Sequence, residues 1–450
     1  SDELQRRFVH WSADLVRSVS GQLRYGVEQA EALELIDSEA VNLRYALRAP
    51  SGEASDAIDI AHALVWSSAM RAGNDDSIRV AEERLIELGG PLTDRYVEAR
   101  LGVALSDTVG ERRSGHGVEG LVEMAEAVGS TRLIALARGI EALGRSENLD
   151  ESLAMVHEAQ ATSDDRWLDG VLHIIEANLV GYVEGVGAAV AAAEAAVEDL
   201  EAVNDRWRTA TALSILGTLR QMSGDYEAAD RTQRQVLGIA DEMGLAYDGF
   251  LARVQMANTA SLRGDHERAI QLANEALRTA GTLGGGARAN GLNTLGRVSN
   301  AMGRFDDARA AHTEALRIYT GLDAFAGIAH SLDNLGLVSS RSGDPEAGAR
   351  RHLQALEINA EKGDPLSVAF SLEGFALALA MRDQGDDAAR LLGAANAQRA
   401  GLGLELPAGE RRYVDAASGL ARESTSDFER SYDEGAETDW RVLVASVREI

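Results

Sequence analysis

The sequence has no cysteine, which excludes a disulfide framework, a zinc–thiolate site and a thiol nucleophile. It has one lysine, Lys362, so a catalytic or phosphate-binding lysine has a single candidate, and that candidate lies in a segment typical of a helix end. The nine histidines never follow HExxH or HxxxH spacing, and neither GxSxG nor GxxxxGK[ST] occurs. We therefore expect no catalytic activity, no metal and no cofactor.

Long apolar runs and prolines are also scarce. The Ala-rich stretch from Gly187 to Val197 is too short to span a bilayer and contains Glu194. The five prolines, at positions 50, 91, 345, 365 and 407, fall at expected helix boundaries or loops. The chain starts at Ser1 without a signal-peptide pattern, so we expect a soluble, cytoplasmic fragment of a longer protein.

Positive charge is limited as well. The chain has 44 Lys and Arg against 72 Asp and Glu, a net charge of −28. Such a charge repels phosphate backbones and anionic lipid surfaces, so neither nucleic acid nor a membrane is an expected direct partner. With 45% hydrophobic residues in 450, however, the chain can bury a large core.

A Gly-containing turn recurs along the C-terminal half at intervals of 40, 39, 40 and 42 residues. Each interval has room for two helices and two turns, somewhat more than the 34 residues of a standard tetratricopeptide repeat. The turns begin at Gly224, Gly264, Gly303, Gly343 and Gly385. This spacing predicts an all-α, right-handed superhelical solenoid of antiparallel helix pairs with a period of about 40 residues.

The residue types at each repeat fit this fold. A small residue follows Leu or Met in the first helix, as at Gly217, Ala257, Gly296 and Gly336, which lets the paired helices approach closely. Glycine at the turn can adopt the left-handed conformation that ends a helix, and the Asp that often follows can cap the next one.

Helical patterns continue upstream in a less regular form. They predict the helix pairs 56–72 with 75–89, 93–108 with 117–129, 131–145 with 149–163, and 166–182 with 184–202. We therefore divide the chain into an N-terminal helical segment (1–55), degenerate repeats (56–204), well-defined repeats (205–401) and C-terminal capping helices (402–450).

Two segments that flank the repeats contain further motifs. Arg6–Trp11 and the later block Glu39–Leu47, with Asn42-Leu43-Arg44, resemble the segment that follows the ATPase module in bacterial STAND-type ATPase transcriptional regulators of the LuxR/SARP-associated type. Leu391–Ala395, Arg399 and Gly403, followed by Phe428 and Gly435, are similar to the end of those proteins. The resemblance implies that this chain is a tetratricopeptide sensor region, with segment 1–55 linking to an ATPase module outside it.

The first helix of each pair is expected to line the concave groove of such a solenoid. Aligning the repeats on their small residues places an amide-rich set there: Asn258, Asn290, Asn293, Arg297, Asn300, His330, Asp333 and Asn334. Amides and Arg present donors suited to a peptide backbone or a carboxylate. We expect a protein, peptide or small-molecule effector in this groove, and the acidic excess on the second helices to face solvent.

Other interpretations remain open from sequence. The asparagines could bond neighbouring helices or water, and Arg297 could simply pair with Asp333. The chain could be a freestanding tetratricopeptide scaffold that binds peptide motifs of partner proteins, or it could self-associate. An enzyme with an unfamiliar site is disfavoured by the missing catalytic motifs.

Overall fold

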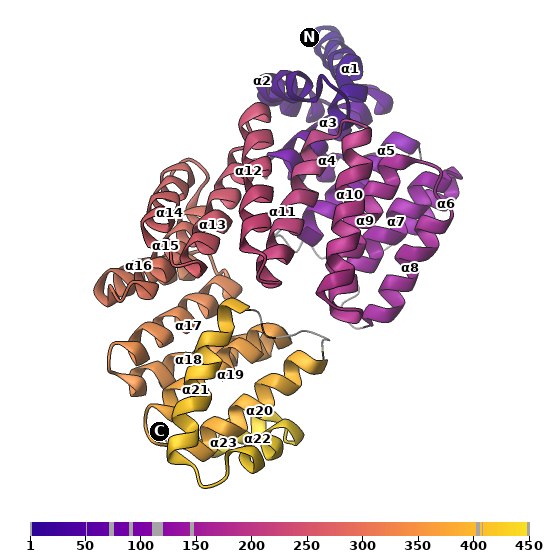
Figure 1. Cartoon of the computed structure of the whole chain (residues 1–450). Helices are drawn as coiled ribbons and strands as arrows, with labels where there is room; N and C mark the ends of the chain where they lie inside the picture. Colours follow the sequence, from indigo (N-terminus) through magenta and orange to yellow (C-terminus); the bar gives the residue numbers. More distant parts are fainter. Residues whose placement is uncertain are drawn as a thin grey trace. The chain divides into compact units, whose positions relative to one another are not determined.

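The computed structural model describes residues 2–50, 52–71, 76–89, 93–109, 120–144, 148–401, 406 and 408–447. Regular secondary structure in these residues is α-helical throughout, with no strand (Figure 1). The predicted all-α fold of consecutive helix pairs is confirmed, since helices adjacent in sequence pack on each other, as in α9 with α10, α15 with α16 and α17 with α18.

The helices of the first half are α1 (Asp2–Arg24), α2 (Gln29–Leu47), α3 (Ala54–Met70), α4 (Ser77–Leu88), α5 (Asp94–Val109), α6 (Leu121–Val128), α7 (Thr131–Gly144), α8 (Leu149–Ala161), α9 (Arg166–Val183) and α10 (Val186–Ala202). The predicted pairs agree with these bounds to within a few residues. The prediction of a helix over 117–129 differs most, because α6 is short and residues 117–119 lie outside the described residues.

The helices of the second half are α11 (Arg206–Met222), α12 (Tyr226–Met243), α13 (Ala246–Leu262), α14 (His266–Ala280), α15 (Gly285–Ala301), α16 (Phe305–Gly321), α17 (Phe325–Arg341), α18 (Pro345–Lys362), α19 (Pro365–Ala380), α20 (Gly385–Gly401), α21 (Ala408–Ser424), α22 (Phe428–Glu437) and α23 (Trp440–Val447). Among the described residues, no helix combines the length and the apolar character needed to cross a membrane.

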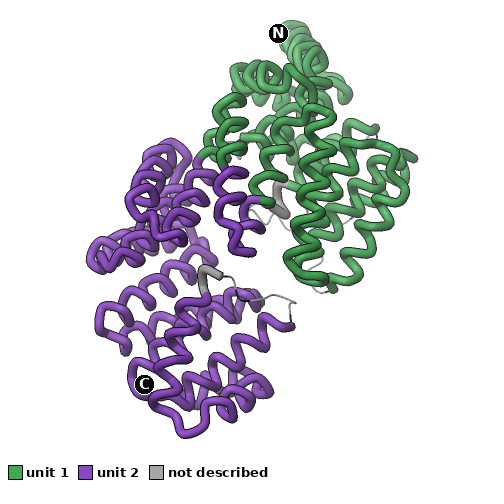
Figure 2. Tube along the Cα trace, viewed as in Figure 1, with its two compact units in different colours: residues 1–216, 234–249 green, residues 217–233, 250–450 purple. Residues whose placement is uncertain are grey.

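The chain forms two compact units. Unit 1 comprises residues 1–216 and 234–249, and unit 2 comprises residues 217–233 and 250–450 (Figure 2). The boundaries fall inside α11, α12 and α13. The division at residues 204 and 401, drawn from repeat regularity, stays a prediction.

The predicted turn glycines adopt the left-handed conformation at four of the five positions. Gly224, Gly264, Gly303 and Gly343 have φ of 82°, 79°, 74° and 97°. At the fifth turn Asp383 takes the left-handed position, with φ of 60°, and Gly385 begins α20. A Cβ on Gly385 would lie 2.5 Å from the carbonyl oxygen of Ala421, so close helix packing, and not the turn, requires glycine there.

The small residues of the first helices permit close contact, as predicted, but the groups they contact are polar side chains. A Cβ on Gly296 would lie 2.5 Å from Nε2 of His312, and one on Gly336 would lie 2.5 Å from Nε2 of His352. In the first repeat of unit 2, Gly217 meets Gln233 in the same way. Each glycine therefore makes room for a large polar side chain of the following helix.

Unit 1 has a buried polar cluster around Arg208. Its guanidinium lies over the rings of Trp66, Trp167 and Trp207, at 5.0, 4.7 and 4.7 Å from their centroids. Its Nη1 donates to Asp205 at 2.6 Å, and Asp205 also accepts from the indole of Trp167 at 2.9 Å. Asp205 further accepts from Gln29 at 3.1 Å, which ties α2 to the start of α11.

Candidate ligand-binding site

A cavity of about 450 Å³ opens within unit 2. Its lining comes from the unit 2 parts of α11 and α13, from α15, α17 and α19, and from α18, α20 and α21. The first helices of successive pairs therefore supply most of the wall. A volume of this size is typical of sites that enclose small molecules.

Six of the eight predicted residues line this cavity: Asn258, Arg297, Asn300, His330, Asp333 and Asn334. The remaining two do not. Asn290 is half-buried on α15. Asn293 lies on the same helix and is buried, and its amide is hydrogen-bonded to Ser331 and His312. The expectation that Asn293 faces the groove is wrong, because its side chain turns into the contact between helices.

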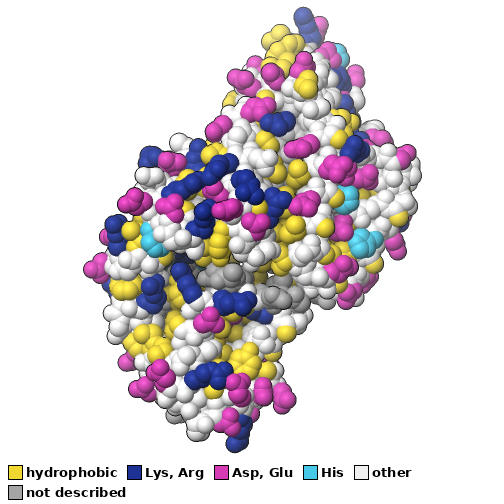
Figure 3. All heavy atoms as spheres, in the orientation of Figure 1, with side chains coloured by type: hydrophobic (Ala, Val, Ile, Leu, Met, Phe, Trp, Pro, Cys, Tyr) yellow, Lys and Arg dark blue, Asp and Glu magenta, His cyan; other side chains and the backbone are white. Residues whose placement is uncertain are grey.

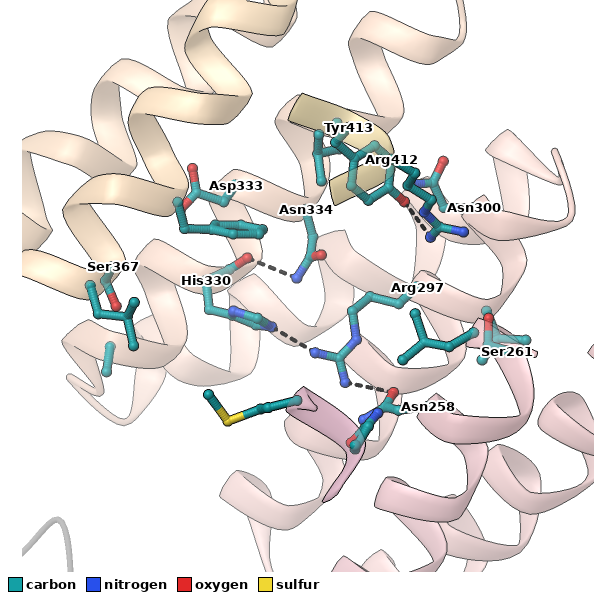
Figure 4. A pocket seen from close by; sticks show the side chains of 18 of the residues that line it. Asn258, Ser261, Arg297, Asn300, His330, Asp333, Asn334, Ser367, Arg412 and Tyr413 are labelled. Atoms are coloured by element: carbon teal, nitrogen blue, oxygen red, sulfur yellow. Dashed lines mark hydrogen bonds between the residues drawn. The ribbon is translucent and has the colours of Figure 1, made fainter. Parts of the chain in front are cut away.

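Arg297 projects from the middle of α15 into the cavity, with its guanidinium between His330 and Asn258 (Figure 4). Nη1 lies 3.2 Å from Nε2 of His330, and Nη2 donates to Oδ1 of Asn258 at 3.0 Å. Nη2 also lies 3.4 Å from the hydroxyl of Thr294. These partners are all neutral, and in the described part of the chain no carboxylate pairs with this guanidinium.

The pairing of Arg297 with Asp333 that the sequence left open does not form. Asp333 is buried, and its carboxyl bonds Nδ1 of His352 at 2.8 Å and the hydroxyl of Ser371 at 2.8 Å. Burial raises the pKa of Asp333, and those two hydrogen bonds partly oppose the rise. The carboxyl group of Asp333 is therefore hydrogen-bonded to buried residues of the neighbouring helices and not to Arg297.

The electrostatics around Arg297 follow from burial. Desolvation lowers the pKa of the guanidinium, which nevertheless keeps its proton because arginine titrates far above neutral pH. Burial and the neighbouring Arg297 lower the pKa of His330 to about 3. His330 is therefore neutral, and its Nε2 accepts the hydrogen bond from Arg297. The centre of the site has one positive charge surrounded by neutral groups.

The two other asparagines of the predicted set that line the cavity have defined partners. Nδ2 of Asn334 donates to the backbone oxygen of His330 at 2.9 Å. Oδ1 of Asn300 accepts from Arg341 at 2.8 Å. These contacts orient the amides along the wall.

The prediction from sequence missed the residues that α21 contributes. Arg412 and Tyr413 line the cavity, and Nη2 of Arg412 donates to the Tyr413 hydroxyl at 2.7 Å. Arg399 also lines it, but its guanidinium is bound to both oxygens of Glu373, at 2.7 and 3.0 Å. Repeat alignment could not identify α21, because this helix lies outside the 40-residue pattern.

The surface shows no division into an acidic and a basic face in the view of Figure 3, where the two kinds of side chain are interspersed over both units. The described residues include no group of three or more His, Asp or Glu side chains placed to hold a metal ion.

Comparisons with known proteins agree with this fold. The tetratricopeptide repeat model matches residues 250–321, which span most of α13 and the whole of α14, α15 and α16. The search of curated proteins finds no match. Among solved structures, the chain is similar to a Rap protein complexed with competence and sporulation factor, with a TM-score of 0.52 and 14% identity over 84% of this chain and 99% of that one.

Two other solved structures are less similar. The apo form of RapI has a TM-score of 0.45 and 13% identity, covering 81% of this chain and 97% of that one. A STAND protein with a tetratricopeptide repeat sensor from Pyrococcus horikoshii has a TM-score of 0.45 and 12% identity, covering 98% of this chain and 73% of that one. Residues 250–321 therefore match tetratricopeptide repeats, and the chain shares the helical-repeat fold of the Rap protein.

Proposed function

We propose that this chain is the sensor region of a STAND-type transcriptional regulator, and that an effector bound in the unit 2 cavity controls ATPase and DNA-binding parts outside this sequence. The resemblance of Arg6–Trp11, Glu39–Leu47 and Leu391–Ala395 to that family supports the proposal. Such control requires that the effector bind the resting and active states with different affinity.

The observation that supports binding most directly is that the guanidinium of Arg297 has no carboxylate partner among the described residues. Arg297 is half-buried, and a charge that is partly removed from water is costly unless it is paired. Here the guanidinium faces an open cavity and contacts neutral groups alone among the described residues. A bound ligand would supply the missing partner.

The fold is consistent with a role in binding and not in catalysis. Tetratricopeptide arrays present extended surfaces for partners, and the Rap protein of similar fold is complexed with a competence and sporulation factor. A freestanding scaffold for partner proteins would use the same surface. The gene upstream of Ser1 distinguishes the two: a phosphate-binding loop encoded there supports the regulator, and a start codon directly before Ser1 supports the scaffold.

Binding in the cavity can be tested with a blocking variant. Ala326 is exposed at the cavity lining, so Ala326→Trp should fill the space without disturbing the core. Ala310→Trp is the matched control, since Ala310 is exposed on α16 and does not line the cavity.

The measurement is native mass spectrometry of the three purified proteins after incubation with extract of the source cells. We expect a bound species on the wild type and on Ala310→Trp, and its loss from Ala326→Trp. The same bound species at the same occupancy on all three proteins would show that the cavity is not the binding site.

A further inference from the structure

We propose, building on the function above, that the ligand is a small amphipathic carboxylic acid whose carboxylate binds Arg297 and whose apolar body lies along the cavity wall. Four features of unit 2 support this chemistry. Arg297 has N–H donors without a protein acceptor among the described residues, and the nearby carboxyl groups are bonded to other residues. Arg297 lies inside α15 and not at its N-terminus, and part of the cavity lining is apolar.

The guanidinium has hydrogen-bonding capacity to spare. An arginine has five N–H donors in a fixed planar arrangement. Contacts to His330, Asn258 and Thr294 account for three of them. In the described chain the other two have no protein acceptor, and the group borders the cavity. A planar carboxylate matches such a group in shape and in charge.

The acids near the cavity are already bonded elsewhere. Asp333 bonds the hydroxyl of Ser371 and a histidine, and Glu373 accepts from Arg399 through both oxygens. A second cation, Arg412, borders the same space from α21. On a chain with a net charge of −28, this cavity thus has local positive charge. An anion is favoured over a cation or a sugar.

The position of Arg297 favours a carboxylate over a phosphate. Phosphates are commonly held by backbone N–H groups at a helix N-terminus, often together with lysine. Arg297 instead projects from the interior of α15, and Lys362, the single lysine of the chain, is not among the lining residues. The guanidinium of Arg297 is planar and has neutral neighbours, which suits the planar group of a carboxylate.

Part of the lining is apolar. Leu262, Val298, Leu337, Leu366 and Phe370 border the same space as Arg297. The volume of about 450 Å³ is in the range of sites for small organic molecules. A ligand with one charged end and a hydrocarbon or aromatic body would satisfy both parts of the wall.

The test uses matched probes and isothermal titration calorimetry on the full chain. The probes are 4-phenylbutyrate, its neutral amide 4-phenylbutyramide, phenyl phosphate, and a tripeptide ending in Phe with either a free or an amidated C-terminus. The proteins are the wild type, Arg297→Gln, Arg297→Lys and the control Arg309→Gln. Arg309 is a partly exposed residue of α16 that does not line the cavity and pairs with Asp306 at 2.9 Å.

We expect the wild type and Arg309→Gln to bind the carboxylate at least tenfold more tightly than its amide. Arg297→Gln should weaken carboxylate binding roughly ten- to a hundredfold and abolish the discrimination between acid and amide. Arg297→Lys should lie between, because lysine keeps the charge and loses the planar arrangement of donors. Circular dichroism and thermal melts confirm that each variant is folded.

Equal binding of acid and amide by the wild type would overturn the proposal, and so would tighter binding of phenyl phosphate. Preference for the free tripeptide over phenylbutyrate would assign the carboxylate to a peptide terminus and overturn the small-molecule assignment. An occupant that Ala326→Trp excludes but that has no carboxylate would refute the ligand class and leave the sensor function standing. A cavity that binds none of the probes and no cellular species would refute both.

Discussion

Asn293 and Asp333 occupy equivalent positions in successive repeats of unit 2 and make the same two hydrogen bonds. Each bonds Nδ1 of the histidine 19 residues later and the hydroxyl of the serine 38 residues later. The partners are His312 and Ser331 for Asn293, and His352 and Ser371 for Asp333. The amide of Asn293 thus makes the same contacts in its repeat as the carboxyl group of Asp333 makes in the next repeat.

Asp333→Asn is therefore expected to change the free energy of unfolding by less than about 1 kcal/mol, because the amide can keep both bonds as Asn293 does. Asp333→Leu should cost about 1–3 kcal/mol, since it leaves Nδ1 of His352 buried without a partner. Urea unfolding monitored by circular dichroism measures both. An equal loss of unfolding free energy in the two variants would contradict the hydrogen bonds of Asp333 to His352 and Ser371.

Gly296→Leu is expected to destabilise unit 2 by several kcal/mol. The added side chain would overlap the imidazole of His312, which lies 2.5 Å from the Cβ position, and buried histidine has no room to retreat. Gly286→Ala on the same helix is the control. Nothing lies within 4 Å of its Cβ position, so alanine there should be neutral or stabilising by up to about 1 kcal/mol. Similar melting temperatures for both variants would refute this packing.

Arg208→Met should destabilise unit 1 by about 3–5 kcal/mol, because it leaves the fully buried carboxylate of Asp205 without its cation. Changing Asp205 to Asn in the same protein should restore part of the loss. Arg206→Ala is the neighbouring control: its ion pair with Glu242 is largely exposed and is worth at most about 1 kcal/mol. Tryptophan fluorescence reports this transition, since Trp66, Trp167 and Trp207 all contact Arg208. Equal losses for the Arg208 and Arg206 variants would argue against the cluster.

The fold could be predicted from sequence because its signals are local. Helix bounds depend on apolar spacing and on capping residues such as Asp265 and Asp344, whose side chains accept from the first turns of α14 and α18. Asp165 and Asp205 mark the starts of α9 and α11 in the same way. These features need no knowledge of the packing between distant segments.

The site could be predicted only in part, because the direction of a side chain depends on its neighbours in space. Asn293 and Asn334 lie near the small residue of their repeats, yet Asn293 points into the helix contact and Asn334 lines the cavity. Arg412 arrives from a helix outside the repeat pattern. The bond between Gln29 and Asp205 joins residues 176 positions apart, and no periodicity indicates it.

The last prediction concerns acid stability and follows from two histidines of unit 2, the buried His312 and the half-buried His330. The pKa of His312 is lowered to about 3 by burial and by the nearby charge of Arg297, with a further contribution from His330 once His330 is protonated. The pKa of His330 is lowered to about 3 by burial and by Arg297. In the unfolded chain both should titrate near 6.5. Below pH 6.5 these two histidines therefore bind protons in the unfolded state but stay neutral in the folded state until the pH approaches 3.

The contribution of these two histidines to the free energy of unfolding is thus fully present above pH 6.5. It is lost as the pH falls toward 3, by about 1.4 kcal/mol per pH unit for each histidine. His312→Gln should remove one proton from this dependence and still fold, because Gln233 fills the equivalent space beside Gly217. Urea unfolding at several values between pH 7 and pH 4.5 gives the slope for the wild type and the variant, and the other titrating groups, Asp333 included, cancel in the comparison. We expect a shallower slope for His312→Gln by about one proton. Identical slopes would mean that His312 is not held neutral in the folded chain.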